Sequence, residues 1–321
     1  MDSIPTLTLC IPVYKGGKYW EECWKSVAPL AHYFDSILVS FNKSELQMKD
    51  VSVLLENKPG NVRYLIQPEF LEPLDHYAAH VDYLDTDYVF FLCHDDCLLE
   101  PGLKEMQMFL RTASGKKIAI FGSQEWSESE ETYPGITREL RAFPSGITVN
   151  DFVLMDLDKN ISFSLSGSVC PVKGLQKIKS MDKLFLKGIR HDNFMITYPG
   201  IERIFQTRCP SVRIQLHPGQ EGRQNYSKER KFDNMTYFFI QGLHGSNDVF
   251  IYRNLKQIIH YLSMNPKKGS ITHFLRLIKE SRHWNITPSQ YFRVSLLFYK
   301  CAMDAVCQRT ANGIKKIVRV E

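Results

Sequence analysis

Apolar runs alternate with helical periods along the first third of the chain. The runs at 6–14, 36–41, 61–66, 88–92 and 116–122 are typical of strands, and the one at 88–92 is uniform enough for a strand buried on both faces. Between them, 19–31, 50–57 and 74–84 are predicted to be helices. Strands that alternate with helices through short connections predict a mainly parallel sheet with helices on both faces, an α/β fold.

Shortly after the run at 88–92 come His94, Asp95 and Asp96, and this segment offers the best candidate for a catalytic or metal-binding site in the chain. Ligands of open α/β sheets bind outside the carboxyl ends of the strands. Two adjacent carboxylates repel each other unless a cation or a proton lies between them, and Mg²⁺ and Mn²⁺ prefer carboxylate oxygen. The alternative is that both acids cap the following helix, which the turn at 100–102 is predicted to open.

The middle of the chain gives weaker signals. Residues 123–148 are acidic and rich in turn residues, which fits either a mobile loop over the site or a solvated insertion. Residues 160–174 alternate apolar and small polar residues, as an edge or mixed strand does, and a further strand is expected at 211–217. Residues 188–196 start a helix or tight turn that contains Asp192. The residues alone favour an acid stabilised by the helix dipole over a catalytic base.

The composition changes beyond residue 232. Helices are predicted at 248–264, 271–282 and 287–309, and residues 253–321 carry a net charge of +10 against −5 for the first 252 residues. We therefore expect a main domain at 1–232 and a basic helical C-terminal subdomain at 233–321. Basic helices with aromatic residues suit either the anionic inner face of a membrane or a packing subdomain with a solvated face.

Overall composition limits the cellular setting. The formal charge of +5 is too mild to demand a nucleic-acid partner, so none is expected. The eight cysteines form no CxxC pair and indicate reduced thiols in a cytoplasmic protein. We identify no signal peptide at the N-terminus and no apolar stretch of about 20 residues, the length that a membrane helix needs.

The order of the motifs resembles the nucleotide-sugar half of family-two inverting glycosyltransferases with the GT-A fold. Their first strand ends in Pro-x-Tyr or Pro-x-Phe near the nucleotide base, and Pro12, Val13 and Tyr14 match this motif. Their acidic motif is Asp-x-Asp-Asp, which puts Cys93 at the first acid and Asp95 and Asp96 at the others. A second departure is Ser-Phe-Asn-Lys at 40–43, where the family has paired acids, so Asn42 becomes the candidate for a base edge or a ribose hydroxyl.

The resemblance also implies roles for residues further along the chain. Asp192 matches the catalytic base, and His217 the late metal ligand beside Asp95 and Asp96. Arg223, with Lys228 and Arg230 as further candidates, would hold the diphosphate. The implied cofactor is Mn²⁺ or Mg²⁺.

The resemblance further implies the architecture and the partners. It predicts a GT-A-like domain with a mixed, mainly parallel sheet, a donor half at about 1–122 and an acceptor half at about 123–232. The expected donor is a nucleotide-sugar, a UDP-sugar first, and the acceptor a saccharide or a lipid-linked oligosaccharide in bacterial capsule or O-antigen assembly. Such an enzyme would work in the cytoplasm, with peripheral contact to the inner membrane through the basic helices.

Two other functions stay open at this point. A nucleotidyltransferase also uses carboxylates at strand ends, but it usually grips a triphosphate with a glycine-rich basic loop after the first strand, where this chain has only Lys15, Gly16 and Gly17. A non-catalytic sugar-binding or lipid-binding module of the same fold is suggested by Cys93 and by the missing acids after the second strand.

Overall fold

A computed structural model describes residues 4–71, 73–112, 118–127, 144–148, 151–152, 166–179 and 201–215. All of them belong to one compact unit. The predicted C-terminal helices lie outside the described residues, as does the expected domain boundary at 232, so both stay predictions. Within the described part, no helix combines the length and the apolar character needed to cross a membrane.

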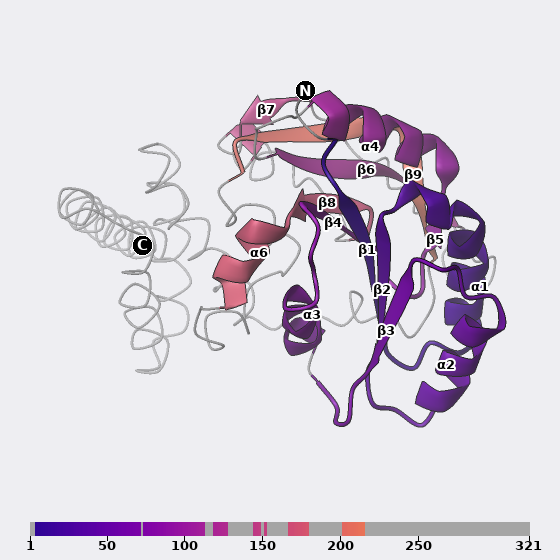
Figure 1. Cartoon of the computed structure of the whole chain (residues 1–321). Coiled ribbons are helices and arrows are strands. Elements are labelled where there is room, and N and C mark those ends of the chain that lie inside the picture. Colours follow the sequence, from indigo (N-terminus) through magenta and orange to yellow (C-terminus); the bar gives the residue numbers. More distant parts are fainter. Residues whose placement is uncertain are drawn as a thin grey trace, which may run out of the picture. The chain divides into compact units, whose positions relative to one another are not determined.

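The first half of the described chain forms a parallel βα unit, as predicted. Its elements are β1 (Leu7–Val13), α1 (Gly17–Val27), the 3₁₀ helix η1 (Ala28–Tyr33), β2 (Ser36–Phe41), α2 (Gln47–Glu56), β3 (Val62–Ile66), α3 (Pro73–Val81) and β4 (Tyr88–Phe91). The four strands pair in parallel in the order β3-β2-β1-β4. In Figure 1, α1 and α2 lie together at one side of these strands and α3 and α6 at the other.

The second half turns the sheet into a mixed one. It contains β5 (Cys97–Leu98), α4 (Glu100–Thr112), β6 (Ile118–Ser127), β7 (Ile147–Thr148), β8 (Ser168–Pro171), α6 (Val172–Lys179) and β9 (Arg203–Gln215). The described strands give one sheet in the order β3-β2-β1-β4-β8-β6-β9-β5, with β7 paired to β9. β8 is antiparallel to both of its neighbours, and β6 and β9 run parallel to each other.

Two of the sequence expectations below need correction. The stretch at 160–174 was expected to be an edge or mixed strand. Its strand β8 lies inside the mixed sheet, between β4 and β6, so the edge alternative is wrong, and the helix α6 follows directly. The turn at Glu100, Pro101 and Gly102 opens the helix α4, as expected, because proline is favoured where a helix begins. α2 begins at Gln47, three residues before the expected start.

The two faces of the parallel strands differ in chemistry. One face is apolar: Leu9 and Ile11 of β1 are fully buried in a cluster with side chains of α1, α2 and α4. The opposite face carries polar groups beneath α3, where Ser40 lies 2.9 Å from Nε2 of His76 and the ring of Tyr77 contacts Phe91. The site described below lies where these strands end.

Candidate functional site

The carboxyl ends of β1, β2 and β4 meet at one edge of the sheet. In the register, Val13 pairs with Phe41 and Cys10 pairs with Phe91, so the three strands end close together. The segments that follow them are 14–17, 42–46 and 92–96. As parallel sheets usually do, the fold therefore presents loops from separate parts of the chain at a common edge.

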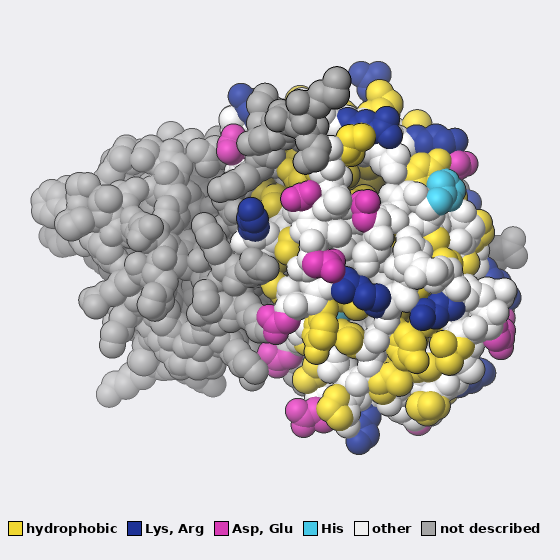
Figure 2. All heavy atoms as spheres, viewed as in Figure 1, with side chains coloured by type: hydrophobic (Ala, Val, Ile, Leu, Met, Phe, Trp, Pro, Cys, Tyr) yellow, Lys and Arg dark blue, Asp and Glu magenta, His cyan; other side chains and the backbone are white. Residues whose placement is uncertain are grey.

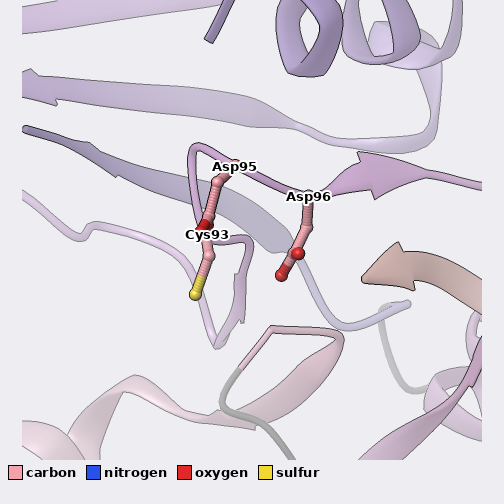
Figure 3. A group of neighbouring side chains, drawn as sticks. All are labelled: Cys93, Asp95 and Asp96. Atoms are coloured by element: carbon pink, nitrogen blue, oxygen red, sulfur yellow. The ribbon is translucent and has the colours of Figure 1, made fainter. Parts of the chain in front are cut away.

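Three side chains that could hold a metal ion gather after β4. One ligand atom from each of Cys93, Asp95 and Asp96 lies within 4.8 Å of the others. Figure 3 shows the three side chains extending from their loop in the same direction. The strand β5 lies between Asp96 and the start of α4 at Glu100, so the alternative that the acids cap this helix is wrong.

Asp96 is deeply buried and has two polar partners. The backbone N–H of Gln215 donates to its Oδ1 at 3.1 Å, and the hydroxyl of Ser166 is a second partner. Burial raises the pKa of the Asp96 carboxyl well above its usual range, and the negative charge of Asp95 raises it further. The ionised pair is therefore costly unless a positive charge joins it.

The donor set fits a divalent cation. Two carboxylates supply the hard oxygen ligands that Mg²⁺ and Mn²⁺ prefer, while the thiol of Cys93 is a softer donor that suits Mn²⁺ better than Mg²⁺. Burial raises the pKa of the Cys93 thiol well above its usual range, and the hydroxyl of Tyr77 lies 3.8 Å from its sulfur. The thiol therefore keeps its proton until a cation displaces it.

The turn after β1 is fixed by a buried carboxylate from α2. The backbone N–H groups of Gly16 and Gly17 donate to Asp50 at 3.0 and 2.9 Å, and the indole N–H of Trp20 donates to the Asp50 backbone carbonyl at 2.8 Å. Gly17 has φ +50°, and a side chain on Gly16 would lie 2.4 Å from Cβ of Trp20. Both glycines are therefore required by the shape of this turn.

An aromatic pair lies at the same edge. The ring of Tyr14, the first residue after β1, lies 5.3 Å from the ring of Phe70, which follows β3 and is half exposed. The ammonium of Lys15 lies 5.6 Å above the Tyr14 ring and 3.2 Å from the carboxylate of Glu45. In Figure 2, hydrophobic side chains gather in the lower part of the view, in the area where Figure 1 shows β3 and the segment after it.

The other donor-side candidates are Pro12, Val13 and Asn42, and all three are buried. Pro12 and Val13 are buried inside β1, and the carbonyl of Val13 accepts the backbone N–H of Asn42 at 2.8 Å. The Asn42 side chain is buried: its Nδ2 donates to the carbonyl of Leu71 at 2.7 Å, and its Oδ1 accepts the N–H groups of Leu71 and Lys43. Asn42 thus ties the end of β2 to the segment before α3, and its contact with a base stays a prediction.

Sequence reasoning brought Asp95 and Asp96 into one site with Cys93, but it missed the residues that support them. Asp192, His217 and Arg223 lie outside the described residues, so their roles stay predictions. The missed partners of Asp96 are Ser166 and Gln215. Sequence reasoning also missed Gln47, Asp50 and Phe70, which contact the loops after β1 and β3 or the Tyr14 ring. Only a glycine pair after the first strand hinted at one of them, because a turn that needs two glycines also needs an acceptor for its N–H groups.

Comparisons with known proteins bear on the fold. No family model matches the sequence, and no curated protein matches it. Solved structures of Staphylococcus aureus TarS are similar to the chain. TarS 1–349 in complex with UDP-GlcNAc gives a TM-score of 0.58 at 13% identity over 85% of this chain and 79% of that one.

A second solved structure agrees with the first. TarS 1–349 in complex with UDP gives a TM-score of 0.56 at 11% identity, over 92% of this chain and 88% of that one. Identities this low bear on the fold alone. The described unit thus has a GT-A-like α/β fold with a mixed, mainly parallel sheet, as the sequence predicted.

Proposed function

We propose that the chain is a metal-dependent inverting glycosyltransferase that moves a sugar from a nucleotide-sugar to an acceptor hydroxyl. The observation that carries this proposal is the group formed by Cys93, Asp95 and Asp96 at the carboxyl end of β4 in a GT-A-like sheet. At the same edge of the sheet, Tyr14 and Phe70 offer an aromatic surface for a base. A candidate metal group and a surface for a base at one edge of the sheet suit a nucleoside diphosphate.

The cation would be held by Asp95 and Asp96, with His217 as a further ligand. Gln215, which contacts Asp96, precedes His217 by two residues in the sequence. When bound, Mn²⁺ or Mg²⁺ supplies positive charge to a departing diphosphate. Arg223 would add a forked donor for phosphate oxygens.

Asp192 is the proposed catalytic base. An acceptor hydroxyl has a very high pKa, so a positioned carboxylate must take its proton as the oxygen attacks the anomeric carbon. The new carbon–oxygen bond forms as the bond to the diphosphate breaks on the opposite side, which inverts the anomeric centre. The proton stays on Asp192 and the bonding electrons leave with the diphosphate.

The proposals for the donor and for the acceptor rest on different support. A UDP-sugar is the proposed donor, and the solved complexes of TarS with UDP and UDP-GlcNAc support this choice. The acceptor is proposed to be a saccharide or a lipid-linked oligosaccharide in bacterial capsule or O-antigen assembly, on the resemblance alone. The basic helices that the sequence predicts beyond residue 232 would then contact the inner face of the membrane.

The geometry of the turn after β1 disfavours a nucleotidyltransferase. The N–H groups of Gly16 and Gly17, which would have to grip a triphosphate, both donate to the carboxylate of Asp50. Lys15, the basic residue of this turn, contacts Glu45. A triphosphate would therefore meet a buried negative charge behind the loop.

A non-catalytic module of the same fold is the second candidate, because Cys93 stands where the family has an acid. Replacing Asp192 with Asn separates the two functions. The proposal expects loss of sugar transfer with donor binding retained. Unchanged function in polysaccharide assembly would remove Asp192 from the mechanism.

A thermal-shift screen tests the proposal. The protein is heated with UDP, GDP, CDP or dTDP and with common sugar nucleotides, each with and without Mn²⁺, since a ligand that binds only the folded state raises its apparent stability. The proposal expects a shift with one nucleotide that requires Mn²⁺. No shift with any of them would favour the non-catalytic module.

A further inference from the structure

The first turn of α2 reaches two loops that are far apart in the sequence. Nε2 of Gln47 donates to the backbone carbonyls of Phe41 and Gln67 at 3.1 and 3.0 Å. Three residues later on the same helix face, Asp50 accepts the N–H groups of Gly16 and Gly17. One helix turn thus holds both the loop after β1 and the loop after β3.

These two loops carry the aromatic pair. Tyr14 directly precedes the turn that Asp50 fixes, and Phe70 lies three residues after Gln67. Their rings lie 5.3 Å apart with an angle of 52° between their planes. The relative position of the rings therefore depends on contacts made by α2.

Further hydrogen bonds restrict the loop that carries Phe70. The side-chain amide of Gln67 donates to the hydroxyl of Ser40 at 3.1 Å, and the amide of Asn42 pairs with both backbone groups of Leu71. The loop is thus tied at its start and at its end. Phe70, between these ties, remains half exposed and available to a ligand.

Burying the ionised carboxylate of Asp50 costs free energy. The residue is 1% exposed, and burial raises the pKa of its carboxyl even though two N–H groups stabilise the ionised form. The nearby His94, from the segment that carries the acids, acts in the opposite direction on this pKa. A buried charge of this kind needs a reason beyond packing, and the loop it fixes supplies one.

We propose that Gln47 and Asp50 are positioning residues that hold Tyr14 and Phe70 as one platform for the base of the nucleotide. The inference rests on the proposed function and deepens it. Neither residue touches the reacting atoms, so their effect should appear in the binding of the base. Binding of a diphosphate that lacks a base should not depend on them.

The test compares two ligands in three variants. The affinities of UDP and of inorganic pyrophosphate, both in excess Mn²⁺, are measured by calorimetry for Asp50→Asn, Gln47→Ala and the control Met48→Ala. Asp50→Asn keeps the shape but points an amide at one of the two N–H groups. Met48 lies on the same helix turn and is 68% exposed, so its variant should match the wild type.

We expect both test variants to weaken UDP about tenfold, the size of one or two lost hydrogen bonds, and to bind pyrophosphate as the wild type does. Unchanged UDP affinity, or equal losses for both ligands, would overturn the inference. If Asp50→Asn fails to fold, Gln47→Ala decides. A wild type that binds pyrophosphate but not UDP would overturn this inference, and one that binds neither would overturn the proposed function as well.

Discussion

Asp50 and Asp96 are two buried aspartates at the same edge of one sheet, and their surroundings differ. Asp50 is 1% exposed and accepts two backbone N–H groups of a glycine turn. Asp96 is 2% exposed, accepts one backbone N–H, and faces Asp95 and Cys93 within 4.8 Å. Two carboxylates with similar burial thus differ in their surroundings: one shapes a loop, and the other belongs to a group that could hold a cation.

The largest expected effect is on the Asp96 side of this comparison. Asp95→Ala removes a hard oxygen ligand from the proposed cation site, so Mn²⁺ binding in the presence of UDP should weaken about 100-fold or more. The measurement is a titration of Mn²⁺ followed by electron paramagnetic resonance. Asp85→Ala, which removes an exposed acid that pairs with Arg63, is the control. Equal Mn²⁺ affinity in both variants would exclude Asp95 as a ligand.

A stability change should follow from the packing that supports Asp96. A side chain on Gly102 of α4 would lie 2.4 Å from the backbone nitrogen of Ser211 in β9, the strand whose end contacts Asp96. Gly102→Ala should therefore lower the free energy of unfolding by about 2–3 kcal/mol. Gly60→Ala, with open space around the new methyl group, should change it by less than about 0.5 kcal/mol. Urea unfolding of both variants checks this, and equal losses would contradict it.

The isosteric variants Asp50→Asn and Asp96→Asn test the difference between the two aspartates directly. Asp50→Asn leaves a buried N–H without its acceptor and should lower the free energy of unfolding by about 1–2 kcal/mol. Asp96→Asn keeps an oxygen for Gln215 and removes a charge from the neighbourhood of Asp95, so without metal it should be neutral or stabilising. Urea unfolding in EDTA measures both. A larger loss for Asp96→Asn than for Asp50→Asn would reverse the two assignments.

Buried histidines on the polar face of the sheet make the stability of the fold depend on pH. Burial lowers the pKa of His76 to about 4 and that of His80 to about 3, from 6.5 in the unfolded chain. The unfolded chain then binds more protons below pH 6.5, so stability is full above that pH and falls as the pH drops toward 4. We expect a loss of about 1 kcal/mol per histidine for each pH unit below 6.

The variant His80→Leu makes this effect specific. It should reduce the slope of stability against pH by about half, because His76 still titrates. Urea unfolding at pH 7.5, 6.5, 5.5 and 4.5 gives the slope. An unchanged slope would mean that His80 takes up its proton in the folded state as easily as in the unfolded one.

Local signals explain which parts of the fold the sequence could predict. β2 was expected at 36–41 and lies there, because this mainly apolar run lies between the polar residues Asp35 and Asn42. The start of α2 was placed too late, because Gln47 faces loops rather than an apolar core. β8 was expected as an edge or mixed strand, because serine and glycine at 166–168 are typical of a solvent-exposed strand face. In the structure Ser166 and Ser168 are buried.

Local sequence patterns also explain which site residues could be predicted. Asp95 and Asp96 could be found because adjacent acids after an apolar run are a local pattern. Asp50 could not be found, because its partners lie 34 and 33 residues away and no period of its own helix reveals them. Phe70 was missed for a similar reason, since only the fold brings it to Tyr14.

The most direct test of the account is a calorimetric titration of UDP into the wild-type protein, once with Mn²⁺ and once with EDTA. The account predicts binding at a single site with Mn²⁺ and at least a tenfold weaker affinity with EDTA, because the buried acids then repel the diphosphate. Equal affinity in both buffers, or no binding in either, would contradict the claim that Asp95 and Asp96 form a cation site for a nucleotide donor.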